Sequence, residues 1–164
     1  TTIRKEPLME KTARAVMRTR FDVLSPKHTI REAVVFLQNA SRKRGRRVFG
    51  MMVTDENDRL VGMLSMYDIF IFLRPKHIEI WGEMKDLDLS GLIDDALEKA
   101  GELLVGDLMT TDLISITPDT NLMMIVDIMI KKHVRRLPVL SGEKIEGIVY
   151  ISEVFDYLLE KFEK

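Results

Sequence analysis

The stretch Arg59–Ile69, RLVGMLSMYDI, recurs at Lys144–Val154 as KIEGIVYISEV. Both stretches place apolar residues around one glycine and then reach a hydroxyl-bearing residue and an acid. A second block, a Ser-Pro or Thr-Pro pair followed by a helix-like pattern, precedes each stretch at Pro26 and Pro118. A unit that occurs twice is expected to fold about a pseudo-two-fold axis, with clefts between the copies as natural ligand sites. The sequence therefore predicts two copies of one supersecondary unit.

Each copy is predicted to hold a strand, a helix, two strands and a helix. In the first copy, Thr29 and Glu32 form a capping-box pattern, and apolar residues follow at helical spacing. Pro75 is expected to end the last helix, because the residue before proline disfavours helical geometry. The remaining predicted elements of this copy are a strand at Val23–Leu24, a polar break at Ser41–Arg47, strands at Val48–Val53 and Leu60–Leu64 around the turn Asp55–Asp58, and a helix at Asp68–Leu73.

The predicted organisation separates the two copies by a connector that contains a helix at Leu92–Ala100. The acidic run Asp86–Gly91 imitates the start of a calcium loop, but Leu97 stands where the loop needs a bidentate glutamate. No metal site is predicted. The predicted divisions are an N-terminal segment at 1–11, the first copy at 12–75, the connector at 76–103 and the second copy at 104–164.

The composition excludes several classes of protein. The 164 residues are 46% hydrophobic, carry a net charge of -1 and include no cysteine, so neither a disulfide framework nor a thiolate nucleophile is available. No apolar stretch approaches the length of a membrane span, and we expect a soluble, cytoplasmic protein without a membrane partner. No pattern of nucleophile and base or of metal ligands is present, so the chain is predicted not to be an enzyme.

The order and spacing of these motifs resemble a tandem pair of CBS domains, the regulatory modules first noticed in cystathionine β-synthase. The resemblance rests on Asp107–Thr110, Ile116–Thr120, Arg135–Val139 and the two segments that run from glycine to acid. It implies an α/β (α+β) fold with two pseudo-two-fold-related units, each a small sheet with two helices packed on it. It also implies that adenosine-containing ligands bind in the cleft between the units, and that the module forms a homodimer.

Gly62, Ser65 and Asp68 match the family's motif for ribose recognition. A carboxylate at Asp68 can accept hydrogen bonds from both vicinal hydroxyls of a ribose, and the Ser65 hydroxyl can reach the sugar or a phosphate. The same spacing also describes a capping box that starts a helix, and the two roles can coexist.

The second copy has Gly147, Tyr150 and Glu153 at the matching positions, so the two sites are expected to be unequal. Tyr150 either fills its cleft or stacks on an adenine face.

Further ligand residues are expected in three places. Strand residues before the prolines are candidates for an adenine slot, with ordinary buried strand as the alternative. Two arginines before Leu137 are candidates for phosphate binding, with a solvated strand end as the alternative. His133, Arg46 and Arg47 are additional phosphate candidates, although His133 also fits a surface or capping role. The slot candidates are Leu24, Ser25, Ile114 and Ile116, and the two arginines are Arg135 and Arg136.

The function predicted from these residues is a regulatory module that senses AMP, ADP, ATP or S-adenosylmethionine and acts on a partner protein whose identity the sequence does not reveal. The adenine nucleotide is then a regulatory ligand, and no catalytic cofactor is expected. The first copy is longer than the second, and the excess falls on the basic segment Arg42–Arg47. The alternative function is a nucleic-acid-binding accessory protein that uses this basic insertion. That insertion lacks interleaved aromatic residues for base stacking, and a solvated loop is the simpler interpretation.

Overall fold

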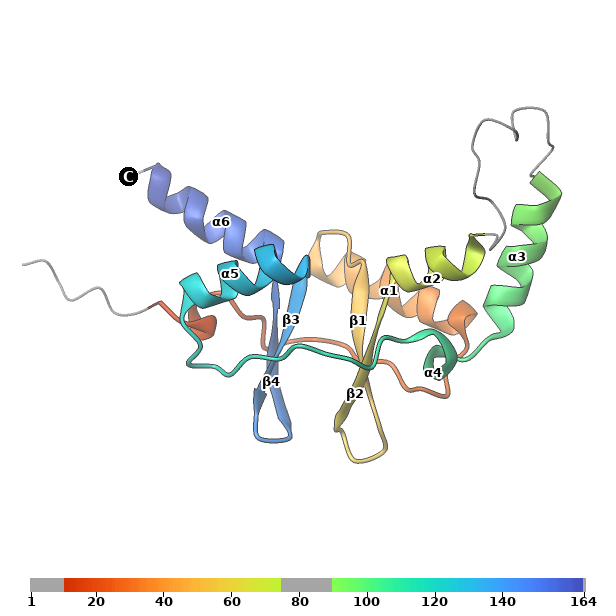
Figure 1. Ribbon diagram of the computed structural model, residues 1–164, viewed down its shortest axis with the longest axis horizontal. Helices are drawn as coiled ribbons and strands as arrows, with labels where there is room; N and C mark the ends of the chain where they lie inside the picture. Colours follow the sequence, from red (N-terminus) through yellow and green to blue (C-terminus); the bar gives the residue numbers. More distant parts are fainter. Residues whose placement is uncertain (1–10, 75–89, 164) are drawn as a thin grey trace, which may run out of the picture. The chain divides into compact units, whose positions relative to one another are not determined.

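The computed structural model describes residues 11–74 and 90–163, and these form two compact units (Figure 1). One unit is continuous in sequence, Asp22–Leu113, and is called the continuous unit below. The other joins the residues up to Phe21 with those from Ile114 onward, and is called the split unit. Both mix helices with a two-stranded antiparallel sheet, as the expected α/β (α+β) class requires.

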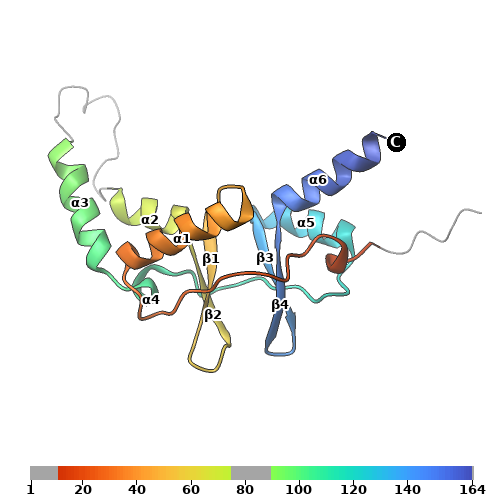
Figure 2. The same cartoon turned by 180° about the vertical axis from the view of Figure 1, so that it is seen from behind.

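The continuous unit is built on the hairpin of β1 and β2. The register runs from Gly50 opposite Ser65 to Thr54 opposite Leu60, with an irregularity after Val53. The chain turns at Asp55–Asp58 as predicted, and this turn projects away from the helices of its unit (Figures 1 and 2). The elements of this unit are α1 (Ile30–Arg44), β1 (Gly50–Thr54), β2 (Leu60–Ser65), α2 (Met66–Leu73), α3 (Ser90–Glu102) and α4 (Val105–Leu108).

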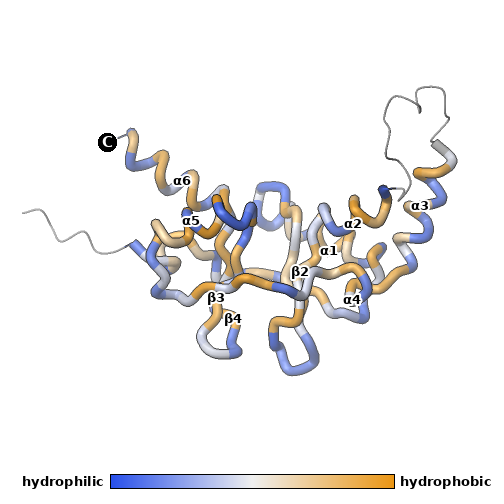
Figure 3. Tube along the Cα trace, viewed as in Figure 1, coloured by the Kyte–Doolittle hydropathy of each residue, from blue (hydrophilic) through white to orange (hydrophobic). Residues whose placement is uncertain are grey.

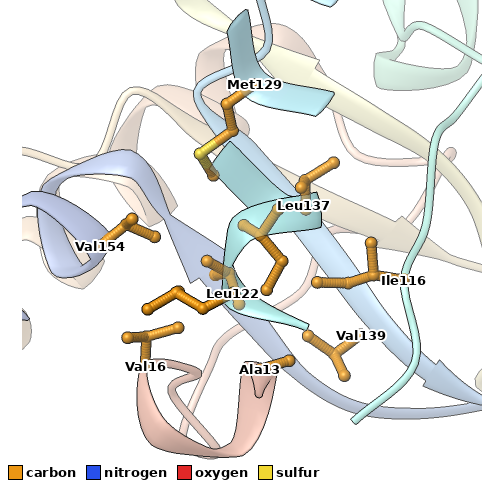
Figure 4. Close-up of a cluster of buried hydrophobic side chains, with 10 residues drawn as sticks. Ala13, Val16, Ile116, Leu122, Met129, Leu137, Val139 and Val154 are labelled. Carbon is orange, nitrogen blue, oxygen red and sulfur yellow. The ribbon is translucent and has the colours of Figure 1, made fainter. Parts of the chain in front are cut away.

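The split unit repeats this plan on the hairpin of β3 and β4. Its buried core gathers side chains from the N-terminal turn, α5, both strands and α6 (Figure 4). The hairpin turns of both units are hydrophilic, whereas their strands are largely apolar (Figure 3). The elements are the 3-10 turn η1 (Ala13–Ala15), α5 (Leu122–Lys132), β3 (Arg136–Ser141), β4 (Lys144–Tyr150) and α6 (Ile151–Phe162).

Each hairpin is extended on both sides by a short bridged segment. In the continuous unit, Leu24 pairs in parallel with Val53, and Thr110 pairs antiparallel with Met63. The split unit has matching bridges from Ile116 to Val139 in parallel and from Arg18 to Ile148 antiparallel. The strand predicted at Val23–Leu24 contributes one such bridge rather than a longer ladder.

These bridges show that the two sequence copies exchange their leading segments, meaning that the residues at the start of each copy pack on the hairpin of the other copy. Residues 11–21 complete the unit that holds the second hairpin, and residues 104–113 complete the unit that holds the first. The compact units therefore divide the chain differently from the predicted boundaries at 12–75 and 104–164, which follow the sequence repeat. The physical reason is that the outer β4 and β2 strands are each covered by a segment from the other copy.

Helix α1 begins where the capping pattern predicts and ends later than expected. The Thr29 hydroxyl accepts from the Glu32 N–H at 3.1 Å, and the Glu32 carboxylate accepts from the Thr29 N–H at 3.2 Å. The predicted polar break at Ser41–Arg47 is wrong for its first part, because the helix continues to Arg44 and ends at Gly45 with a left-handed φ of 75°. Basic side chains in a last turn oppose the negative end of the helix dipole, and glycine adopts this terminating geometry without strain.

The connector helix predicted at Leu92–Ala100 is confirmed as α3, which packs against α1 and α2. The predicted acidic turn at 86–89 lies outside the described residues. Within the described ranges, every helix is too short or too polar to cross a membrane.

Candidate ligand-binding site

Asp68 lies at the junction of β2 and α2, where it joins three polar groups. Its Oδ2 accepts from the Ser65 N–H at 2.8 Å and from the Ser65 hydroxyl at 3.1 Å. Its Oδ1 accepts from the Thr110 hydroxyl at 2.9 Å. The half-buried carboxylate is therefore held in one orientation by two segments of the continuous unit.

The capping interpretation of Ser65 and Asp68 is confirmed. The Asp68 N–H donates to the Ser65 hydroxyl at 3.3 Å, so both halves of the capping box are present at the start of α2. This does not use all of the acceptor capacity, because two carboxylate oxygens offer about four lone-pair directions and three donors occupy them. Oδ1, which holds only the Thr110 hydroxyl, is the oxygen with capacity for a ligand hydroxyl. A vicinal diol that binds through both of its hydroxyls would displace Thr110.

The matching junction in the split unit has a different chemistry. Arg18, which bridges to β4 as Thr110 bridges to β2, approaches Glu153 with Nη1 to Oε1 at 3.4 Å. Tyr150 is the residue before α6, and no side-chain cap accompanies it. An ion pair here stands where the continuous unit has a hydroxyl-to-carboxylate contact. That the two junctions are unequal as ligand sites stays a prediction.

Gly62 and Gly147 are explained by backbone packing within the units. A Cβ at Gly62 would lie 2.5 Å from Met109 Sδ and 3.1 Å from the Thr110 carbonyl oxygen. A Cβ at Gly147 would lie 2.5 Å from the Arg18 carbonyl oxygen. Glycine allows the exchanged segments to approach the strands closely. A ligand contact at Gly62 stays a prediction.

The residues predicted for the adenine slot lie on the outer bridged segments. Leu24 and Ile116 are buried, and their backbones are engaged with β1 and β3, respectively. The Ser25 N–H donates to His28 Nδ1 at 3.0 Å, and its hydroxyl accepts from the Lys27 N–H at 3.2 Å. Ile114 packs on the core of the split unit. An ordinary buried strand position accounts for Leu24 and Ile116. Ligand contact stays a prediction for all four residues.

The phosphate candidates occupy two places. Arg135 is exposed and Arg136 half-buried at the start of β3, and the Arg135 carbonyl accepts from the Ile151 N–H at 2.8 Å. His133 ends α5 in the left-handed region with φ 52°, which supports the capping interpretation. Arg46 and Arg47 are exposed between α1 and β1 in the other unit. The two sets of phosphate candidates thus belong to different units.

Sequence reasoning missed Thr110 and Arg18 as neighbours of the two acids. Thr110 was noted only as part of a family motif, and Arg18 not at all. The repeat contains the signal, because Lys11–Arg18 stands the same distance before Pro26 as Leu103–Thr110 stands before Pro118. Since these segments pack on the opposite copy, their contacts are non-local and were not visible in either motif alone.

Comparison with known proteins identifies the repeated unit. The sequence model of the CBS domain matches residues 13–74 and 105–160. The chain is 29% identical over 140 residues to the CBS domain-containing protein CBSX1, chloroplastic, of Arabidopsis thaliana. That match covers 77% of this chain and 54% of the relative, so the chain spans about half of that relative's length.

Solved structures show the same fold. The CBS-pair protein CBSX2 from Arabidopsis thaliana is 25% identical with a TM-score of 0.70, over 93% of this chain and 97% of that one. A structure of CBSX2 in complex with AMP is 27% identical with a TM-score of 0.64, over 91% of this chain and 96% of that one. The bound AMP belongs to that crystal structure of CBSX2.

Proposed function

The chain belongs to the CBS domain family, and on that premise we propose that it is a regulatory module that binds adenosine-containing ligands. The observation that carries the proposal is the oriented carboxylate of Asp68 at the junction of β2 and α2. A carboxylate that is already fixed by neighbouring donors loses little conformational freedom when a ligand binds. The AMP complex of the related CBSX2 supports the same class of ligand.

Asp68 is assigned to the ribose. Its Oδ1 accepts one ligand hydroxyl directly, and release of the Thr110 hydroxyl provides the second acceptor direction that a vicinal diol requires. The Ser65 hydroxyl already makes two hydrogen bonds, because it donates to the Asp68 carboxylate and accepts from the Asp68 N–H. Its contact with sugar or phosphate would therefore rearrange the cap of α2, which couples ligand binding to the start of that helix.

The continuous unit is proposed to hold the principal site. In the split unit the carboxylate of Glu153 is paired with Arg18, and its side chain is only 24% exposed. A ribose there would have to break that ion pair, and Tyr150 occupies the position of Ser65. We assign the regulatory output to a homodimer or to a partner protein, and the chain to the cytoplasm; catalysis has no part in the proposal.

A ligand panel tests the proposal. AMP, ADP, ATP and S-adenosylmethionine are added separately to the full chain, and the shift in melting temperature is measured for each. Binding stabilises the folded state by mass action, so at least one ligand should raise the melting temperature in a concentration-dependent way. The shift should be strongly reduced in Asp68→Ala.

The matched control is Glu32→Gln, which alters the capping box of a different helix, α1, in the same unit. This variant should keep the full ligand-induced shift. If none of the four ligands moves the melting temperature of the wild type, or if both variants respond equally, Asp68 does not bind the ligand.

A further inference from the structure

A shallow groove of about 320 Å³ lies on one face of α1, away from the junction that holds Asp68 on α2. Its volume is at the lower end of pockets that bind small organic groups, about 300–1,000 Å³. This surface is called the α1 basic groove. It is lined by Asp22, Phe36, Asn39, Arg42 and Lys43.

Helical spacing places an aromatic ring beside the basic side chains. Phe36, Asn39 and Lys43 follow at intervals of three and four residues, so they share one face of α1. Phe36 is 36% exposed, and the His28 ring packs against it with centroids 4.8 Å apart. The ring is therefore held in place from one side and reaches the groove on another.

Arg42–Arg47 itself contains no aromatic residue for base stacking. The helix continues into the first part of this segment, to Arg44, and places Phe36 in the same groove as Arg42 and Lys43. Phe49, which is 51% exposed, stands at the other end of the segment, directly before β1.

The basic side chains of the groove can exchange their present partners for phosphate oxygens. Lys43 pairs with Asp22 at 3.3 Å, with side chains 70% and 40% exposed, and Arg42 donates to Asn39 at 3.4 Å. Such exposed pairs contribute little to stability, so phosphate oxygens can replace these partners. Arg47 is exposed in the loop after Gly45, outside the lining of the groove.

We propose that the α1 basic groove binds single-stranded nucleic acid together with the loop that follows α1. One base stacks on Phe36, two backbone phosphates contact Arg42 and Lys43 in the groove, and a third contacts Arg47 in the loop. Aromatic side chains next to cations are the usual elements of single-strand binding, since each base has a π face and each linkage a negative charge. A duplex hides its base faces in the stack, so it would use the cations but not Phe36.

The test is fluorescence anisotropy of a labelled oligothymidylate with the full chain at several salt concentrations. Three phosphate contacts predict that log K falls with log salt with a slope of about -2. Phe36→Leu should weaken binding by about fivefold or more while the slope is retained. The double variant Arg42→Gln/Arg47→Gln should weaken binding and make the slope shallower by more than one unit.

The control is Lys131→Gln/Lys132→Gln, which removes the basic residues from the last turn of α5. This control and Asp68→Asn should both bind the oligonucleotide like the wild type. The proposal is overturned if the wild type gives no anisotropy change at low salt. It is also overturned if Phe36→Leu binds normally or duplex DNA and heparin compete as well as the single strand, because the surface would then attract any polyanion by charge alone.

Discussion

Substituting Gly147 by alanine tests the exchange of segments between the two copies. The added Cβ would lie 2.5 Å from the carbonyl oxygen of Arg18, 3.3 Å from its carbonyl carbon and 3.4 Å from Met17 Sδ. The nearest obstacle is backbone, so no side-chain rotation relieves it. The Arg18 segment must either move or stay in a strained contact.

The magnitude follows from these two possibilities. Overpacking at a well-packed site destabilises by about 1–3 kcal/mol. Movement of the segment would break the hydrogen bonds from the Arg18 N–H to the Ile148 oxygen at 2.8 Å and from the Ile148 N–H to the Arg18 oxygen at 3.0 Å, each contributing about 1 kcal/mol. Either route predicts that Gly147→Ala lowers the free energy of unfolding by about 1–3 kcal/mol.

The assay is urea denaturation followed by circular dichroism, with two further glycine variants as references. Gly62→Ala meets the flexible Met109 side chain first, so its loss should be smaller, about 1–2 kcal/mol. Gly91→Ala lies in α3 with nothing within 4 Å and should be neutral or slightly stabilising. If Gly147→Ala behaves like Gly91→Ala, the N-terminal segment does not pack on β4 as described.

Three other predictions concern the core, a cap and the ion pair. Ile125→Ala, at a position with 0% exposure, should lower the free energy of unfolding by about 2–5 kcal/mol in the same assay. Hydrogen bonds from the Thr29 backbone and hydroxyl lower the pKa of Glu32 from its ordinary value of 4.5. The Glu32 carboxylate therefore stabilises the fold at pH values above its unfolded pKa, and this stabilisation is lost as the pH falls through its folded pKa. Glu32→Gln should thus be less stable than wild type at neutral pH and equal to it well below pH 4.5; a constant difference would contradict this reasoning. A double-mutant cycle on Arg18 and Glu153 should give a coupling of at most about 1 kcal/mol, because the pair is partly exposed, and a much larger value would show a more buried contact.

Much of the fold was predictable because its signals are local. The capping pattern at Thr29, the acidic turn after β1 and the proline-bounded repeats depend on residues close together in sequence. The end of α1 was misplaced because a run of basic residues suggests a polar loop, although the same residues suit a helix C-terminus. The exchange of leading segments was not predicted, because the pairing of Arg18 with Ile148 spans most of the chain.

The candidate site was only partly predictable for the same reason. Ser65 and Asp68 are three residues apart, so both of their roles could be read from spacing. The third member, Thr110, is 42 residues from Asp68 in sequence, and β-strand pairing alone brings it there. The roles of the two glycines likewise depend on the segments that cross them.

The most direct test of the central claim is calorimetric titration of AMP into the wild-type chain and into Asp68→Asn. The substitution keeps the size of the side chain and removes the charge that strengthens hydrogen bonds from ribose hydroxyls. Charged hydrogen bonds contribute about 1.5–3 kcal/mol, so we expect measurable binding to the wild type and an affinity at least about tenfold weaker in the variant. Equal affinity in the two proteins would contradict the assignment of Asp68 as the ribose-binding residue.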